Sequence, residues 1–302
     1  MLPGHAALIY ATLTIVFWST VATAFKLSLE HVGFLPLVFY SSLVSMLALG
    51  GLCHLNGKFA ELARWHPADY LRSLGLGLLN PALYYLVLFR AYELLPAQEA
   101  QVLNFTWPIV LTVLGALFLG QRLSWISMLA IFVSFMGVVV IATRGAPLSM
   151  QFSNITGVSL ALASTLVWAT YWVINQTEKR DALLRLFVNF VAGTAWMALL
   201  MTVGDHWQLP GIKGGLGAVY IGLFEMSLAF FCWFQALKLS RNISMLNNMI
   251  FLTPFGSLMV IYWVLEEPVY PSTLVGLTLI IGSILMQNLV TSWRRERSGA
   301  VS

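Results

Sequence analysis

Long apolar stretches separated by short polar connections run along the whole chain. Ten of them hold about 20 residues with few charged side chains, the length that an α-helix needs to cross a bilayer. They cover residues 6–27, 33–55, 70–92, 98–119, 124–143, 155–175, 184–203, 215–237, 243–264 and 272–292. The stretches are continuously apolar and lack the alternation typical of barrel strands. The pattern therefore predicts an all-α integral membrane protein with ten transmembrane helices.

Composition supports the same class of protein. Hydrophobic residues make up 59% of the chain and charged residues 9%, whereas a soluble domain holds about 25% charged residues. The N-terminal stretch lacks a preceding basic region and is long enough to span, so we expect a transmembrane helix and not a cleaved signal peptide. Cys53 and Cys232 lie in apolar stretches, which disfavours a disulfide framework or a metal site.

The distribution of basic residues predicts the orientation. Ten spans place both termini on one side, and the segments on that side hold 12 of the 16 lysines and arginines. The other side holds Lys26, Arg90, Arg144 and Lys213. Because cytoplasmic loops carry the excess of Lys and Arg, we expect both termini in the cytoplasm and the chain in the inner (plasma) membrane. The net charge of +4 then reflects these loops and not nucleic-acid binding.

The two halves of the chain are similar to each other at an offset of roughly 145 to 150 residues. "VFWST" around Trp18 matches "LVWAT" around Trp168, and the stretch ending at Pro108 matches the stretch ending at Pro254. Five spans in each half force the second copy into inverted topology, a recurring plan of secondary transporters with a site near the membrane midplane. We therefore expect two inverted five-helix repeats, 1–147 and 148–302, the second with a short basic tail.

One acidic residue, Glu225, lies in the middle of the predicted span 215–237. At the repeat offset it pairs with Asn80, which precedes Pro81. An ionisable group inside a membrane is costly and indicates a functional site by default. Glu225 therefore either lines a cavity and meets an ammonium group, or carries a proton as the proton-coupling candidate, or stays protonated and ties helices together. Asn80 either lines the cavity or repairs backbone bonds loosened by the proline.

Polar and aromatic side chains gather in the interiors of the same spans. Aromatic rings stack on indole or phenyl groups, worth about 0.5–1.5 kcal/mol per pair beyond area burial, and their faces attract ammonium groups. We therefore predict a substrate-binding set of Trp18, Asn80, Tyr84, Tyr85, Gln101, Asn104, Trp107, Trp168, Tyr171, Glu225, Phe230, Trp233, Asn247 and Asn248. Helix packing is the alternative role of the two tryptophans in 6–27 and 155–175.

Several residues have expected roles outside this set. Pro81, Pro108 and Pro254 are predicted to kink their helices. Tryptophans near span ends are expected at the membrane interface, namely Trp125, Trp263 and Trp293. Lys26 and Arg90 are expected to extend their ammonium and guanidinium groups toward that interface.

These features resemble the drug/metabolite transporter superfamily in its ten-helix form of two EamA-type repeats. The resemblance covers the whole chain. It rests on Trp18-Ser19 and Trp168-Ala169, and on "RAYELLPAQEAQVLNFTWPIVLTVLGALFLGQRLSW" with its counterpart "QALKLSRNISMLNNMIFLTPFGSLMVIYWVLEEP". Gln121 departs from the glutamate usual in the family, whereas Glu267 keeps it, where we expect hydrogen bonding to a helix terminus. The stretch "NPALYY" is most similar to the YddG-type branch, which exports aromatic amino acids.

The resemblance implies a secondary transporter that exports aromatic or other apolar amino acids and related small metabolites through a central cavity. Its expected partners are the substrate and the lipid bilayer, with no nucleic acid and no cofactor, and a functional monomer is expected. Broader drug or metabolite efflux by proton antiport is the alternative, and the sequence does not separate antiport from facilitated diffusion. The spans carry no mid-span basic residue for phosphorylated substrates, and the five histidines form no metal-ligand cluster.

Two other classes of protein are disfavoured by the sequence. An integral-membrane enzyme would show a catalytic or metal-binding motif, and no GxSxG, HExxH or CxxC occurs. A sensor or scaffold would need an output domain, and the short connections leave no room for one.

Overall fold

The computed structural model describes residues 3–120, 124–149, 154–240 and 243–299. Within these ranges the side chains of 3–4, 119, 149, 176, 243–244, 247 and 291–299 are not described. Gln121 and the side chains of Asn247 and Trp293, which the sequence singled out, therefore lie outside the described part of the chain.

The described residues form helices joined by short connections and contain no strand, as the hydrophobic pattern predicts. The first half contains α1 (Pro3–Leu29), α2 (Phe34–Leu55), η1 (Lys58–Arg64), α3 (Pro67–Gly77), η2 (Leu78–Leu83), α4 (Tyr84–Leu94), α5 (Ala97–Asn104), α6 (Trp107–Leu119), α7 (Trp125–Ala142) and η3 (Pro147–Ser149). The second half contains α8 (Ile155–Gln176), α9 (Ala182–Val203), α10 (Ile212–Tyr220), η4 (Ile221–Leu228), α11 (Ala229–Leu239), α12 (Ile243–Met249), η5 (Ile250–Leu252), α13 (Thr253–Val264) and α14 (Pro271–Gly299).

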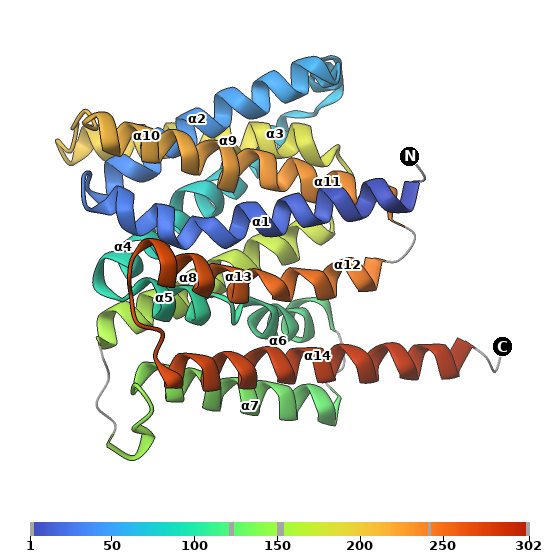
Figure 1. The fold of residues 1–302 in the computed structure, drawn as a ribbon. Coiled ribbons are helices and arrows are strands. Elements are labelled where there is room, and N and C mark those ends of the chain that lie inside the picture. The colour runs from blue at the N-terminus through green and yellow to red at the C-terminus, as the bar shows by residue number, and fades with distance from the viewer. Residues whose placement is uncertain (1–2, 121–123, 150–153, 241–242, 300–302) are drawn as a thin grey trace.

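These elements form ten membrane-crossing segments. In the described ranges, nine helical stretches are long and apolar enough to cross a membrane, and a shorter apolar helix covers Ile250–Val264. The shorter one belongs to the predicted span 243–264, which the structure divides into α12, the single turn η5 and α13. The segments lie side by side with both chain ends at the same end of the bundle (Figure 1). The prediction of an all-α membrane protein is confirmed.

Short polar side chains begin several of the spans. Ser124 Oγ accepts the Ser127 N–H at the start of α7 (3.1 Å). Asn154 Oδ1 accepts the Gly157 N–H at the start of α8 (2.9 Å). Each cap satisfies an N–H group that the first helical turn leaves without a partner. The loop sequences thus fix where these spans start.

Asp181 begins α9 and joins it to the loop after α2. Its Oδ1 accepts the N–H groups of Leu183 and Leu184 (3.1 and 3.0 Å), and its Oδ2 lies 2.8 Å from Lys58 Nζ. Burial by itself raises the pKa of the Asp181 carboxyl, but these hydrogen bonds outweigh burial and hold that pKa below its ordinary value. The pair anchors the end of the bundle where the chain termini lie.

Small residues allow close crossings inside the bundle. A Cβ on Gly77 would lie 2.7 Å from Ala192 Cβ, and a Cβ on Gly137 would lie 2.8 Å from the Gly276 carbonyl oxygen. The second crossing joins α7 to α14, where the hydroxyls of Ser134 and Ser283 are 2.7 Å apart. Because lipid tails are as apolar as leucine, membrane helices associate through such close packing and polar contacts.

The crossing of α9 over Pro81 gives a first testable prediction. A Cβ on Gly193 would meet the Pro81 ring and would lie 2.8 Å from the Gly77 carbonyl oxygen. Gly193→Ala should therefore lower the stability of the folded protein by about 2 kcal/mol, as overpacking does, measured as thermal unfolding in detergent. Gly215→Ala is the matched control, since nothing lies within 4 Å of a Cβ there. Equal melting temperatures of the two variants would contradict the packing argument.

Candidate functional site

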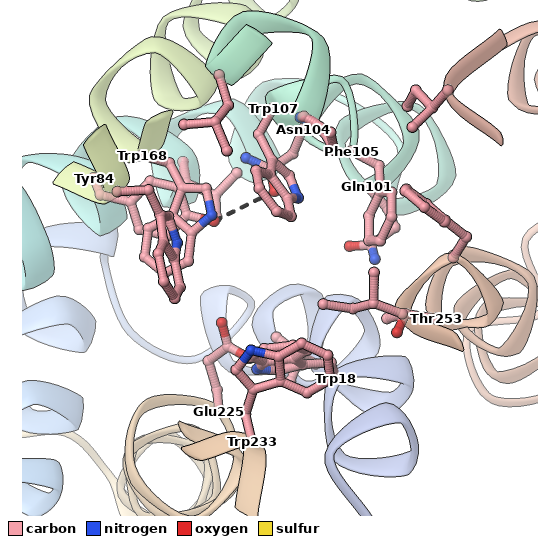
Figure 2. A pocket seen from close by; sticks show the side chains of 18 of the residues that line it. Trp18, Tyr84, Gln101, Asn104, Phe105, Trp107, Trp168, Glu225, Trp233 and Thr253 are labelled. Carbon is pink, nitrogen blue, oxygen red and sulfur yellow. Dashed lines mark hydrogen bonds between the residues drawn. The ribbon is translucent and has the colours of Figure 1, made fainter. Parts of the chain in front are cut away.

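A cavity of about 450 Å³ opens in the centre of the bundle. Its walls come from α1, α4, α5, α6, α8, η4, α11, η5, α13 and α14. Figure 2 shows Tyr84 and Trp168 on one side, with Trp18, Trp233 and Glu225 facing them across the space. Nine predicted residues line it: Trp18, Tyr84, Gln101, Asn104, Trp107, Trp168, Glu225, Phe230 and Trp233.

Aromatic rings form much of the wall. Trp168 stacks on Tyr84, with centroids 4.7 Å apart and planes at 27°, and on Tyr171 at 5.8 Å and 19°. Trp18 meets Phe230 edge-on, with ring centroids 5.8 Å apart, and the centroids of Trp18 and Trp233 are 6.2 Å apart. Such rings offer flat apolar faces, whose negative quadrupole also attracts cations. The wall therefore suits a substrate with an aromatic or apolar group and a positive charge.

Glu225 supplies the acidic group of the cavity. It lies on η4, a π-helical stretch in which the Ser227 hydroxyl donates to the Gly222 carbonyl five residues earlier. One carboxyl oxygen, Oε1, accepts the Tyr85 hydroxyl at 3.1 Å. The other, Oε2, is buried and has no hydrogen-bond partner in the described part of the chain. π-Helical bulges are frequent at functional sites, and this one leaves a carboxyl oxygen free to accept a donor.

Two amide side chains of α5 lie on the side of the cavity opposite Glu225. Asn104 uses both ends of its amide, accepting from Tyr84 (3.3 Å) and donating to Ser164 (2.9 Å). Gln101 accepts the Tyr92 hydroxyl at 2.7 Å, which leaves its NH₂ group to donate. Asn104 therefore fixes the position of Tyr84, whereas Gln101 can offer a hydrogen bond to a substrate.

The three prolines that were predicted to kink their helices lie at breaks in those spans. Pro108 lies in the first turn of α6 and Pro254 in the first turn of α13, each after an interruption of its span. Pro108 also lines the cavity. Pro81 lies inside the π-helical η2, where Asn80 has φ −142° and ψ 117° and the Asn80–Pro81 peptide is cis.

Four other predicted residues lie away from the cavity surface. Tyr85 and Tyr171 are buried behind the aromatic wall, and Asn80 is fully buried at the break in η2. Asn248 pairs with Asn288 at 3.5 Å instead of lining the cavity itself. For the spans that hold Asn80, Tyr85 and Asn248, the apolar pattern did not predict the inward face because breaks in these spans change the direction of the side chains.

Sequence reasoning missed other lining residues. Tyr92, Trp172, Thr253, Gln287 and Asn288 all line the cavity. The polar pair "QN" inside the last span was the available signal for α14, which was not expected to contribute. Lys26, which is expected to extend toward the interface, donates through Nζ to the Tyr92 carbonyl oxygen at 2.6 Å.

Hydrogen bonds join α5 to the loop before α14 at the end of the bundle away from the termini. Glu267 Oε1 accepts the Ala97 N–H at 3.2 Å, a helix-terminus bond of the kind expected for this acid. Gln98 donates to the Pro268 carbonyl (2.7 Å) and accepts from the Tyr270 N–H (2.9 Å) and Thr273 hydroxyl (3.0 Å). Arg144 lies 3.0 Å from the buried carboxyl of Glu99. The Glu267 and Gln98 bonds connect the two halves of the chain beside the cavity, whereas the Arg144–Glu99 pair lies within the first half.

Gln98→Leu should loosen this end of the bundle. The change removes three hydrogen bonds of roughly 1 kcal/mol each, so a state open at this end should become at least about tenfold more populated. The measurement is the labelling rate of Gln101→Cys by an impermeant thiol reagent, in a background with Cys53 and Cys232 replaced by serine. Gln208→Leu, at an exposed loop glutamine, is the control. Unchanged labelling would contradict the prediction.

Known proteins share this architecture. A solved crystal structure matches the fold with a TM-score of 0.64 at 20% identity, over 95% of this chain and 98% of that one. An uncharacterized transporter of Archaeoglobus fulgidus is 25% identical over 90% of this chain and 95% of its own length. A probable terminal-alkyne amino-acid exporter of Streptantibioticus cattleyicolor is 24% identical over 95% and 94%. The aromatic amino acid exporter YddG of Ancylobacter novellus is 25% identical over 74% and 77%.

The family comparison covers both halves of the chain. The sequence model of the EamA-like transporter family matches residues 5–143 and again residues 155–289. The boundary expected near residue 147 falls between the two matches. The chain thus belongs to the EamA-like transporter family of the drug/metabolite transporter superfamily, and it is a multi-pass membrane transporter.

Proposed function

We propose that the protein exports aromatic or other apolar amino acids, and related small metabolites that carry an ammonium group, from the cytoplasm across the inner membrane. One observation carries the proposal: Glu225, which has one carboxyl oxygen without a hydrogen-bond partner among the described residues, lines a cavity walled by tryptophan, tyrosine and phenylalanine. The ammonium group would bind Glu225, and the apolar side chain would lie against the rings.

The size and chemistry of the cavity support this substrate class. About 450 Å³ falls in the range of pockets for small metabolites, which are mostly apolar with a few placed polar groups. A buried carboxylate without a cationic partner is unfavourable, so a substrate ammonium or a proton stabilises the site. The names of two relatives, an amino-acid exporter and an aromatic amino acid exporter, point in the same direction.

The arrangement of the cavity supports loading from the side of the termini. Its lining reaches Leu237 on α11 and Gln287 on α14, toward the end of the bundle that holds both termini (Figure 1). At the opposite end, the Gln98 and Glu267 hydrogen bonds join the two halves of the chain. With the termini in the cytoplasm, as the excess of basic residues on that side favours, this is the conformation that takes up substrate for export by a single chain.

A transport assay tests the proposal. Purified protein in proteoliposomes is loaded with labelled tryptophan, phenylalanine, leucine, aspartate or tryptamine, and efflux is followed with and without a pH gradient. We expect saturable efflux of tryptophan, phenylalanine and leucine, and none of aspartate, whose extra carboxylate would lie against Glu225. Efflux of aspartate alone, or of none of the amino acids, would overturn the assignment. Efflux of tryptamine but not of tryptophan would favour broader amine efflux by proton antiport.

A further inference from the structure

A second group of buried polar side chains lies behind the aromatic wall and outside the cavity lining. Asn80 and Asn189 are 0% exposed, and Tyr171 is 4% exposed. Both polar atoms of the Asn80 side chain, and Oδ1 of Asn189, lack a hydrogen-bond partner among the described residues. Buried polar groups are almost always hydrogen-bonded, often through internal water. Three such atoms close together therefore favour a hydrated interior.

This group is connected to Glu225. The Tyr85 hydroxyl donates to Glu225 Oε1 at 3.1 Å and lies within electrostatic range of the Tyr171 hydroxyl. The Tyr171 hydroxyl accepts the Asn189 amide at 3.3 Å and faces the Asn80 amide. Glu225 thus has the cavity on one side and this polar interior on the other.

The same group also leads toward the ionic cluster at the end that holds the termini. Arg185 lies one turn before Asn189 on α9 and within electrostatic range of Tyr171. Its Nη1 is 4.0 Å from Glu178 Oε2, and Arg180 Nε lies 2.7 Å from the same oxygen. We call Tyr85, Tyr171, Asn80, Asn189 and Arg185 the polar column.

We propose that the polar column conducts protons between Glu225 and the cytoplasm while substrate enters the cavity. The inference rests on the proposed function and deepens it, since it makes the exporter a proton antiporter whose two cargoes reach Glu225 from different sides. The Glu225 carboxyl gives its proton to the Tyr85 oxygen, while the Tyr85 hydroxyl releases its own proton to water held by the amide atoms of Asn80 and Asn189. Each hydroxyl or water oxygen along the column accepts one proton and releases another, and one hydronium ion leaves at the cytoplasmic end. The carboxylate that remains accepts the substrate ammonium.

The ionisable groups around Glu225 fit a proton route that is separate from the route of the substrate. The titratable side chains that face it are Tyr84, Tyr85 and Tyr92, all on α4. The described parts of α1, α2, α10 and α11, which pack against η4, place no other ionisable group there. No second acid beside Glu225 therefore competes for the proton that Glu225 holds. Arg185 disfavours a positive charge that rests at the end of the column, so a proton arriving there passes to water and is not stored.

Replacing Asn189 tests the column. In proteoliposomes, tryptophan–tryptophan exchange at equal pH reports on the cavity, and an internal pH dye reports on proton movement driven by a tryptophan gradient. Asn189→Leu should keep exchange within about twofold of wild type and lower the proton flux at least about tenfold. Asn189→Ser, which places a hydroxyl at this position and can still hold water, should retain most of the flux. Asn80→Leu repeats the test at the other free amide, and Ser134→Ala, at a buried hydroxyl outside the column, is the control.

Each outcome has one meaning. A selective loss of proton flux in both leucine variants supports the column. Equal losses of exchange and flux show that the amides maintain the shape of the cavity, and unchanged flux shows that protons pass elsewhere; either result overturns the proposal. Wild-type protein that exchanges tryptophan without any proton flux overturns the proton inference and leaves the proposed function standing. Wild-type protein that does not exchange any amino acid overturns the proposed function itself.

Discussion

Glu225→Gln should lower the rate of aromatic amino-acid efflux by about 100-fold or more. The substitution keeps the size of the side chain and its hydrogen bond with Tyr85 but removes the charge that we propose binds the substrate ammonium. Loss of one partner of a buried ion pair costs roughly 3–5 kcal/mol, and 1.4 kcal/mol corresponds to a factor of ten. The measurement is kcat/KM for tryptophan efflux from proteoliposomes.

A matched control separates this effect from a general loss of negative charge. Glu266→Gln removes one carboxylate from an exposed loop position with positive φ and should leave efflux unchanged. If Glu225 also carries the proton, the glutamine variant should lose every dependence of residual efflux on the pH gradient. A Glu225→Gln protein with wild-type efflux would show that the carboxyl only joins helices, the structural role that the sequence left open.

Trp168→Ala should have the second largest effect. Trp168 is the centre of the aromatic wall, where it contacts Tyr84, Tyr171, Trp172 and Phe230. Loss of a stacking partner and of buried apolar area costs a bound aromatic ring about 2 kcal/mol, equivalent to about a 30-fold higher KM for tryptophan. Efflux of leucine, which cannot stack, should change much less.

The ratio of the two substrates is the decisive readout. Equal losses for tryptophan and leucine would indicate that Trp168 holds the helices together and does not recognise aromatic rings. Trp263→Ala is the control, because Trp263 is 75% exposed on the outside of α13 and faces the surrounding lipid. It should leave both KM values unchanged.

The sequence predicted more of the fold than of the candidate site, and the reason is physical. A run of about twenty apolar residues satisfies its backbone hydrogen bonds in a bilayer by forming a helix, so the all-helical architecture followed from the length and composition of the spans. Orientation of side chains within a span does not follow in the same way. Asn80 and Glu225 occupy matching repeat positions, yet only Glu225 lines the cavity.

The difference between these two positions lies in the local backbone. Asn80 leaves helical geometry beside Pro81, whereas Glu225 lies on a π-helical stretch with helical dihedral angles at both ends. The contribution of Gln287 was missed for another reason. The last span packs mainly against α7, and the polar pair Gln287-Asn288 was the one sign in its sequence of a face that reaches the cavity. Repeat symmetry predicts which helices correspond, but it does not predict which conformation each copy adopts.

The serine pair between α7 and α14 also bears on the ancestry of the chain. Ser134 contacts Ser283, and a Cβ on Gly137 would lie 2.9 Å from Ile280. At the offset that pairs Pro108 with Pro254, Ile280 corresponds to Ser134 and Ser283 to Gly137. Reciprocal contacts of this kind are the property of an isologous dimer interface. An ancestral five-helix polypeptide inserted in both orientations would have formed the same seam with a second copy of itself. Two such halves in one chain need only a connection between them, and the single chain allows one half to carry the acid Glu225 and the other the amide Asn80.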